Sequence, residues 1–291
     1  MQLASFIRLL RPHQWSKNLL IFVSIFAGHQ LADAVLLSRT TLAFVAFCLA
    51  ASGGYVLNDL ADRHDDRAHP RKRLRPLAAG EIKPAAAAVL AAMLLAAAIA
   101  LAAVVSRELL ACVAAYLAAS QTYTFYAKRK LALDIIFLAG LYDVRIIAGA
   151  VVTGAVPSFW LLAFFMFLFF SLAALKRFVE LAARDDEDLD NNSTRVYRSA
   201  DRAGIAALGS ACGVVSVLVF ALYLNSREVA HLYTNPALLW LACPLLLYWI
   251  ARAWLLAARG LVQDDPVTFA LRDRVSYVLL CLFGLIAAAA T

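Results

Sequence analysis

Four side chains with oxygen ligands follow one another in a charged segment between two apolar stretches. Asn58, Asp62 and Asp66 are spaced four residues apart, and Asp59 lies one position along. If the preceding apolar helix runs on through this segment, their oxygen atoms line one helix face. Proteins hold Mg²⁺ with a few carboxylates together with water and substrate phosphates. The spacing therefore predicts a magnesium site.

Basic side chains come immediately after these acids. The candidates for binding phosphate oxygens are Arg67, His69, Lys72 and Arg75. Cations at these positions would neutralise the oxygens of a magnesium-bound diphosphate that the metal leaves uncovered. The alternative is a solvated loop that only marks the cytoplasmic side of a membrane protein. The regular spacing of the acids favours the diphosphate site.

Two more charged residues lie in an apolar stretch near the middle of the chain. Asp134 begins this stretch, and Arg145 follows three helical turns later, about 16 Å along the axis. Charges at such depth are costly unless they are paired or face a wet cavity. Asp134 is therefore a candidate for binding substrate hydroxyls or completing the metal shell, and Arg145 for binding an anionic head group. A structural pair of Arg145 with Asp143 or another helix stays open.

The remaining candidates stand at the ends of apolar stretches. They are Lys17, Asn18, Tyr123, Lys128, Lys176, Arg177 and Glu180. Their cations suit phosphate groups, but they are also ordinary membrane anchors, and a lysine and a glutamate one turn apart form an ordinary helix pair. The consecutive acids of 185–190 lack helical-face spacing and are interpreted as a solvated loop.

The composition indicates an integral membrane protein. The 291-residue chain is 63% hydrophobic and only 16% charged, with a mean hydropathy of +0.75. A soluble domain of this size would have too little polar surface to cover so much apolar material. The five cysteines are scattered through apolar stretches and show no metal-binding spacing, so they are interpreted as core residues.

Apolar runs of about twenty residues predict about nine transmembrane helices in a single domain, 1–291. We place them at 17–34, 40–60, 84–105, 108–126, 132–153, 158–180, 204–224, 235–257 and 269–289. Nearly all lysines and arginines fall on one side of this topology, and the opposite connections hold only Arg39, Arg107 and Arg227. This asymmetry predicts a cytoplasmic N-terminus and a site that faces the cytoplasm from the inner membrane.

The net charge of +7 follows from this bias, so it does not indicate a nucleic-acid partner. The expected partners are the lipid bilayer and phosphorylated substrates, and the sequence is compatible with a homo-oligomer.

The acidic segment resembles a known family motif. Asn58, Asp59, Asp62 and Asp66, followed by RPLAAG at 75–80, are similar to the first aspartate-rich motif of the UbiA prenyltransferase superfamily. The resemblance implies an all-α membrane fold, with nine helices around a central cavity open to the cytoplasm. It also implies Mg²⁺ at these four residues.

The closer resemblance is to the branch that transfers phosphoribose to decaprenyl phosphate. Its motifs RPxQWxKN, DRxHPxKxxRPxAAG, YxxxxK and KRxxEL begin here at Arg11, Asp66, Tyr123 and Lys176. Ordinary prenyl-transferring members carry a second aspartate-rich motif where this chain has Lys176, Arg177 and Glu180. One acidic and one basic pole suit phosphoribosyl diphosphate, which carries a diphosphate at one end and a monophosphate at the other.

The resemblance therefore implies transfer of 5-phosphoribose from phosphoribosyl diphosphate to a polyprenyl phosphate, in the synthesis of a cell-envelope arabinose donor. The lipid phosphate is already ionised and needs no general base. The main alternative is prenyl transfer from a prenyl diphosphate to an aromatic or other acceptor. A transporter with Asp134 and Arg145 on an ion path would require internal repeats, and no convincing repeat is present.

Overall fold

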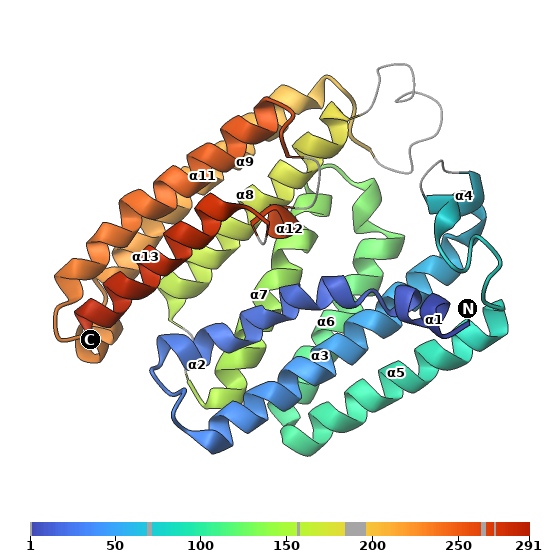
Figure 1. Cartoon of the computed structure of the whole chain (residues 1–291), viewed down its shortest axis with the longest axis horizontal. Helices are drawn as coiled ribbons and strands as arrows, with labels where there is room; N and C mark the ends of the chain where they lie inside the picture. Colours follow the sequence, from blue (N-terminus) through green and yellow to red (C-terminus); the bar gives the residue numbers. More distant parts are fainter. Residues whose placement is uncertain (1, 69–71, 156–157, 184–195, 263–265, 271) are drawn as a thin grey trace. The chain divides into compact units, whose positions relative to one another are not determined.

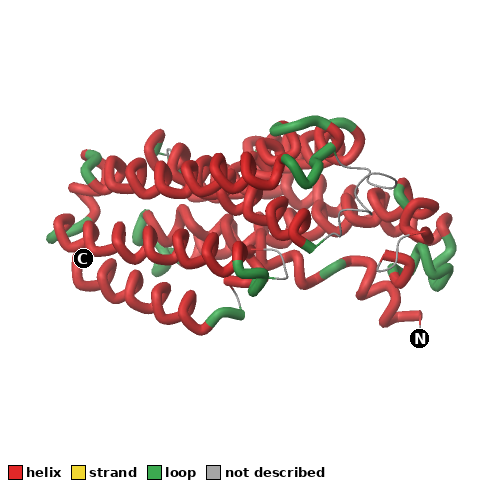
Figure 2. Tube along the Cα trace, turned by 90° about the horizontal axis from the view of Figure 1, so that it is seen from above, coloured by secondary structure: helices red, strands yellow, loops and turns green. Residues whose placement is uncertain are grey.

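The computed structural model describes residues 2–68, 72–155, 158–183, 196–262, 266–270 and 272–291. Within these ranges the chain consists of helices joined by short loops, and no strand occurs in them (Figure 2). The expected all-α class is confirmed for this part of the chain. His69 lies outside the described residues.

Six of the described helices are long and apolar enough to cross a membrane. They are α3 (Ala34–Ala61), α5 (Pro84–Val105), α7 (Leu133–Thr153), α8 (Phe159–Ala182), α9 (Asp201–Leu224) and the segment Pro236–Ala258, made of η5 (Pro236–Leu241) and α11 (Ala242–Ala258).

The other three expected spans are helical but shorter or less apolar. They correspond to η1 (Pro12–Phe22) with α2 (Val23–Ala27), to α6 (Arg107–Phe125) and to α13 (Arg274–Ala290). The count of nine transmembrane helices and the central cavity stay predictions.

The chain divides into two compact units. The first contains Met1–Phe125 and Val144–Val156, and the second contains Tyr126–Asp143 and Pro157–Thr291. The single continuous helix α7 contributes its first half to the second unit and its second half to the first. Each unit is therefore described separately.

In the first unit, α3 packs against α5, α6 and η1 (Figure 1). Helix α7 approaches η1 closely because Gly149 has no side chain: a Cβ there would lie 2.0 Å from the carbonyl oxygen of Ile21. Small residues allow such close approach between membrane helices. The short helix α1 (Gln2–Leu10) buries Leu9 in a cluster with Val56 and Ala87.

In the second unit, α8 and α9 lie side by side and α11 packs against α9 (Figure 1). Gly209 lets α9 approach Trp254 of α11 closely, since a Cβ at position 209 would lie 2.4 Å from the Trp254 ring. The indole of Trp254 in turn donates to Ser171 Oγ at 3.0 Å. This unit also holds the short helices η3 (Ala127–Arg129), α10 (Arg227–Leu232) and α12 (Pro266–Ala270).

Candidate functional site

The helix that carries the acidic motif does not run through it. Helix α3 ends at Ala61, Asp62 caps it, and the separate helix α4 (Arg63–Ala68) begins at the next residue. The predicted single stripe of acids is therefore interrupted at Asp62. The break leaves Asp59 and Asp66 as the buried acids, with 3% and 2% of their surface exposed, while Asp62 is half-buried.

Asp59 and Asp66 converge on one guanidinium. Arg75 Nη1 donates to Asp59 Oδ1 at 3.2 Å and to Asp66 Oδ2 at 2.7 Å. Arg11 Nη2 also donates to Asp59 Oδ1, at 2.6 Å, and Lys72 Nζ lies 3.9 Å from Asp66 Oδ1. The shared guanidinium compensates the burial of both carboxylates, which would otherwise be costly.

This donor set fits magnesium better than a metal held by protein ligands alone. Among the described residues, no three His, Cys, Asp or Glu side chains are grouped closely enough to hold an ion together. Mg²⁺ usually takes one or two carboxylates and keeps water and phosphate oxygens as its other ligands. Asp59 and Asp66 meet that requirement. The metal assignment itself stays a prediction.

Asn58 lies on α3 beside the acidic pair. Its Oδ1 accepts a hydrogen bond from the Thr124 hydroxyl at 3.0 Å, which ties the end of α3 to the end of α6. The Ser120 carbonyl oxygen also lies 3.0 Å from this hydroxyl, whose single hydrogen serves one of the two acceptors at a time. Because the amide oxygen of Asn58 already has this partner, metal ligation by Asn58 would require it to accept a second contact or to exchange the first.

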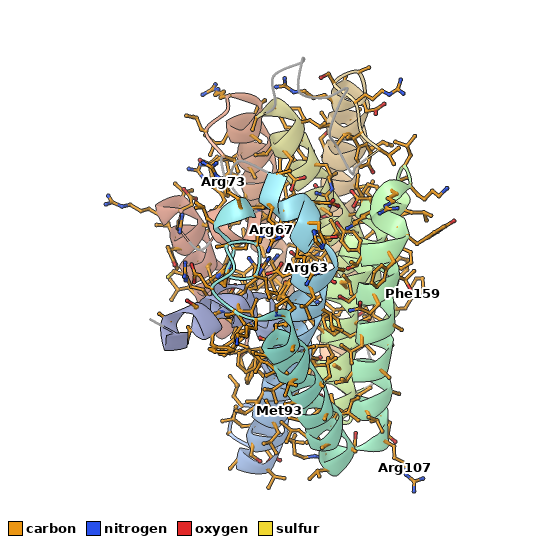
Figure 3. The ribbon with its side chains drawn as sticks, turned by 90° about the vertical axis from the view of Figure 1, so that its right-hand side faces the viewer. Arg63, Arg67, Arg73, Met93, Arg107 and Phe159 are labelled. Atoms are coloured by element: carbon orange, nitrogen blue, oxygen red, sulfur yellow. The ribbon has the colours of Figure 1, made fainter. Side chains whose placement is uncertain are left out.

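The basic side chains around α4 are only partly engaged with the acids. Arg67 Nε donates to the Ala78 carbonyl at 3.2 Å. Figure 3 shows Arg63, Arg67 and Arg73 gathered around α4. Arg107, the first residue of α6, lies far below them in the same view. The first unit therefore concentrates positive charge at the end that carries the acidic motif, as a diphosphate site requires.

A second polar cluster surrounds Arg145, which is 4% exposed. Arg145 Nε donates to Asn18 Oδ1 at 2.7 Å, and Nη2 donates to the Tyr116 hydroxyl at 3.3 Å. The Tyr116 ring centroid lies 4.7 Å from the guanidinium carbon, and Asn18 Nδ2 donates to Cys48 Sγ at 3.2 Å. Neighbouring elements of the first unit thus hold Arg145 through Asn18 and Tyr116. Asn18 is fully buried and orients Arg145.

A third cluster lies in the second unit. Arg177 forms two hydrogen bonds with Asp134, from Nε to Oδ2 and, at 3.0 Å, from Nη2 to Oδ1. Its Nη1 donates to Glu180. The Tyr197 hydroxyl accepts the backbone N–H of Ala132, which has a φ of +62°. Burial, followed by the nearby Asp134 charge, raises the pKa of Tyr197.

The other sequence candidates are half-buried on short helices or helix ends. Lys17 is in η1, Tyr123 in α6, Lys128 in η3 and Lys176 in α8. Each takes part in interactions of its own unit. The structure therefore groups Asp59, Asp66, Lys72 and Arg75 in the first unit and Asp134, Arg177 and Glu180 in the second.

Sequence reasoning did not select Arg11, Tyr116 or Tyr197 as site residues. Arg11 could have been selected from the sequence, because it is the first residue of the RPHQWSKN segment that resembles a family motif. No sequence feature pointed to the two tyrosines, because their partners come from distant parts of the chain.

A sequence model of the UbiA prenyltransferase family matches residues 19–275. The chain belongs to this family. Six helices in the described part of the chain are long and apolar enough to cross a membrane, so it is a membrane protein.

Individual relatives refine the comparison. The decaprenyl-phosphate phosphoribosyltransferase of Mycolicibacterium smegmatis is 34% identical over 97% of this chain and 91% of its own length. The nodulation protein NoeC of Azorhizobium caulinodans is 34% identical over 94% and 89%. The uncharacterized protein y4nM of Sinorhizobium fredii is 38% identical over 93% of this chain, but the chain spans only 52% of that protein.

A solved structure agrees with the fold of this UbiA family member. A UbiA homologue from Archaeoglobus fulgidus, bound to GPP and Mg²⁺, superposes with a TM-score of 0.73 over 98% of this chain and 99% of that one. The two sequences are 17% identical, so this likeness supports the fold alone.

Proposed function

We propose that this protein transfers 5-phosphoribose from phosphoribosyl diphosphate to a polyprenyl phosphate, releasing diphosphate. The observation that carries the proposal is the convergence of buried Asp59 and Asp66 on Arg75, with Lys72 beside them. Similarity to the phosphoribosyltransferase of Mycolicibacterium smegmatis over nearly the whole chain supports the choice of phosphoribose over a prenyl group.

Asp59 and Asp66 would hold Mg²⁺, which, when bound, supplies charge neutralisation for the leaving diphosphate. Arg75, Lys72 and Arg67 would neutralise the remaining diphosphate oxygens through charge-assisted hydrogen bonds. The sugar loses its C1–O bond, and an oxygen of the ionised lipid phosphate forms the new bond to C1. No side chain has to remove a proton from this nucleophile.

From the sequence, Lys176 and Lys128 stay our candidates for the 5-phosphate. The guanidinium of Arg177 already donates to Asp134 and Glu180. Arg177 is therefore a weaker candidate for binding phosphate than the sequence indicates. Arg177 would instead position these two carboxylates, and Asp134 stays our candidate for the ribose hydroxyls.

The test is a product assay with purified protein in lipid nanodiscs. Phosphoribosyl diphosphate, Mg²⁺ and polyprenyl phosphates of two chain lengths are supplied, and the lipids are analysed by mass spectrometry. We expect a lipid phosphate heavier by one phosphoribosyl group, with one diphosphate released per product. A parallel reaction supplies a prenyl diphosphate with an aromatic acceptor. Prenylated acceptor without any phosphoribosyl lipid would refute the proposal.

A further inference from the structure

Arg11 stands in an unusual conformation at the junction of α1 and η1. It is not a glycine, yet its φ of 52° and ψ of 58° place it in the left-handed region. Its guanidinium carbon lies 5.2 Å from the centroid of the Tyr55 ring, and its Nη2 donates to Asp59 Oδ1 at 2.6 Å. Strained backbone of this kind persists where the surrounding contacts require it, often at functional sites.

Two arginines share a single oxygen of Asp59. Arg75 Nη1 lies 3.2 Å from the same Oδ1 that Arg11 reaches. Asp59 is buried, with a side chain only 4% exposed, whereas the Arg11 side chain is 22% exposed. A divalent cation at this carboxylate would therefore meet two positive charges at close range. Like charges repel strongly where water is scarce, so at least one guanidinium must withdraw.

The two arginines differ in what holds them. Arg75 also donates to Asp66 Oδ2 at 2.7 Å, so it contacts both candidate metal ligands, and in our proposal it turns to the diphosphate oxygens. Asp59 is the carboxylate with which Arg11 pairs, and the Tyr55 ring face remains beside Arg11 when that pair is broken. Arg11 therefore opposes the metal at Asp59 alone, and its withdrawal leaves the contact of Arg75 with Asp66 intact.

We propose that Arg11 competes with the divalent cation for Asp59. Without metal, its guanidinium compensates the buried carboxylate and keeps it in place; with metal, it leaves Oδ1. Arg11 is thus a positioning residue that sets the affinity of the site for the ion. The inference rests on the proposed function only in taking Asp59 as a metal ligand.

The experiment measures Mn²⁺ binding to the purified full chain in nanodiscs, with neither phosphorylated substrate present. Electron paramagnetic resonance of free Mn²⁺ gives the Kd. We expect Arg11→Gln to lower this Kd about fivefold, the upper range for one partly exposed ion pair. Arg11→Lys retains the charge and should stay closer to the original protein. Arg8→Gln, which removes an arginine paired with Glu81, is the matched control and should leave the Kd unchanged.

Thermal unfolding provides a second readout. Without metal, Arg11→Gln should unfold at a lower temperature, because buried Asp59 has lost one compensating charge. Added Mn²⁺ should raise its Tm by more than it raises the Tm of the original protein. A residue with only a packing role would lower the Tm without increasing the gain from Mn²⁺.

An unchanged or higher Kd in folded Arg11→Gln protein would overturn the inference, as would an equal change in Arg8→Gln. If neither the original protein nor Arg11→Gln binds Mn²⁺, the inference is wrong, because Arg11 then has no ion with which to compete. If the Kd falls as expected but no phosphoribosyl lipid forms in the product assay, the inference stands and the proposed function fails.

Discussion

Arg177 and Asp134 form a buried ion pair with two hydrogen bonds, and their side chains are 2% and 0% exposed. Arg177 lies near the end of α8, and Asp134 lies in the first turn of α7. The pair therefore connects two helix ends of the second unit. Because the planar guanidinium fits the carboxylate at two points, this contact specifies the orientation of both side chains.

Removing one member of this pair should be far more damaging than removing both. Arg177→Met leaves a buried carboxylate without its cation and should destabilise the second unit by about 3–5 kcal/mol. The double variant Arg177→Met/Asp134→Asn should regain much of that loss. Thermal unfolding in nanodiscs measures the effect, and Lys176→Gln, at the half-buried neighbouring position, is the control. Additive losses in the double variant would show that the two residues do not stabilise one another.

Asp66→Asn should nearly abolish turnover without unfolding the protein. The amide retains the shape of the side chain but loses the negative charge that would bind the metal, so we expect a loss of at least about 100-fold in kcat. Chelation of divalent ions with EDTA should have the same effect on the original protein, reversed by added Mg²⁺. Near-normal turnover of the folded variant would contradict the assignment of Asp66.

Gly149→Ala should destabilise the first unit, because the new methyl group would lie 2.0 Å from the Ile21 carbonyl oxygen. Backbone atoms cannot rotate aside as a flexible side chain can, so α7 and η1 must separate. Overpacking of this kind costs about 1–3 kcal/mol. Gly140→Ala is the matched control on the same helix, since its added carbon would meet no atom within 4 Å apart from the nearby backbone of α7 itself. A lower Tm for the first variant alone would confirm the close contact.

Acid should weaken the contact between α1 and Glu81. Glu81 accepts hydrogen bonds from Ser5 and Arg8, and these contacts, first that of Ser5, hold the pKa of Glu81 below its ordinary value of 4.5. A lowered pKa stabilises the folded protein fully above pH 4.5, and that stabilisation is lost as the pH falls through the lowered value. Hydrogen exchange of the α1 amides, corrected for its intrinsic pH dependence, should therefore accelerate below pH 4.5.

Glu81→Gln provides the control for this titration. The variant cannot lose a charge at position 81, so its α1 amides should show no such transition in the same pH range. A transition that persists in the variant would assign the effect to another carboxylate.

The acidic motif shows how far sequence reasoning reached at the site. The residue types and their spacing predicted an oxygen-ligand site with cations beside it, since carboxylates and basic residues adjacent in the sequence remain near one another in space. Which acids would converge was not predictable. That outcome depends on the helix break at Asp62, and Arg11, 48 positions before Asp59 in the sequence, joins them only through folding.

Hydrophobicity alone determined that this chain is helical and belongs in a membrane, because backbone polar groups in lipid must be satisfied within each segment. It also located the helical segments, from the second apolar run at α3 to the last at α13. Only the tertiary structure decided the partners of the buried charges. Arg145 binds Asn18 and Tyr116, and Arg177 binds Asp134. These pairings lower the cost of burying charge, and they join residues far apart in the chain. They therefore cannot be predicted from the local sequence.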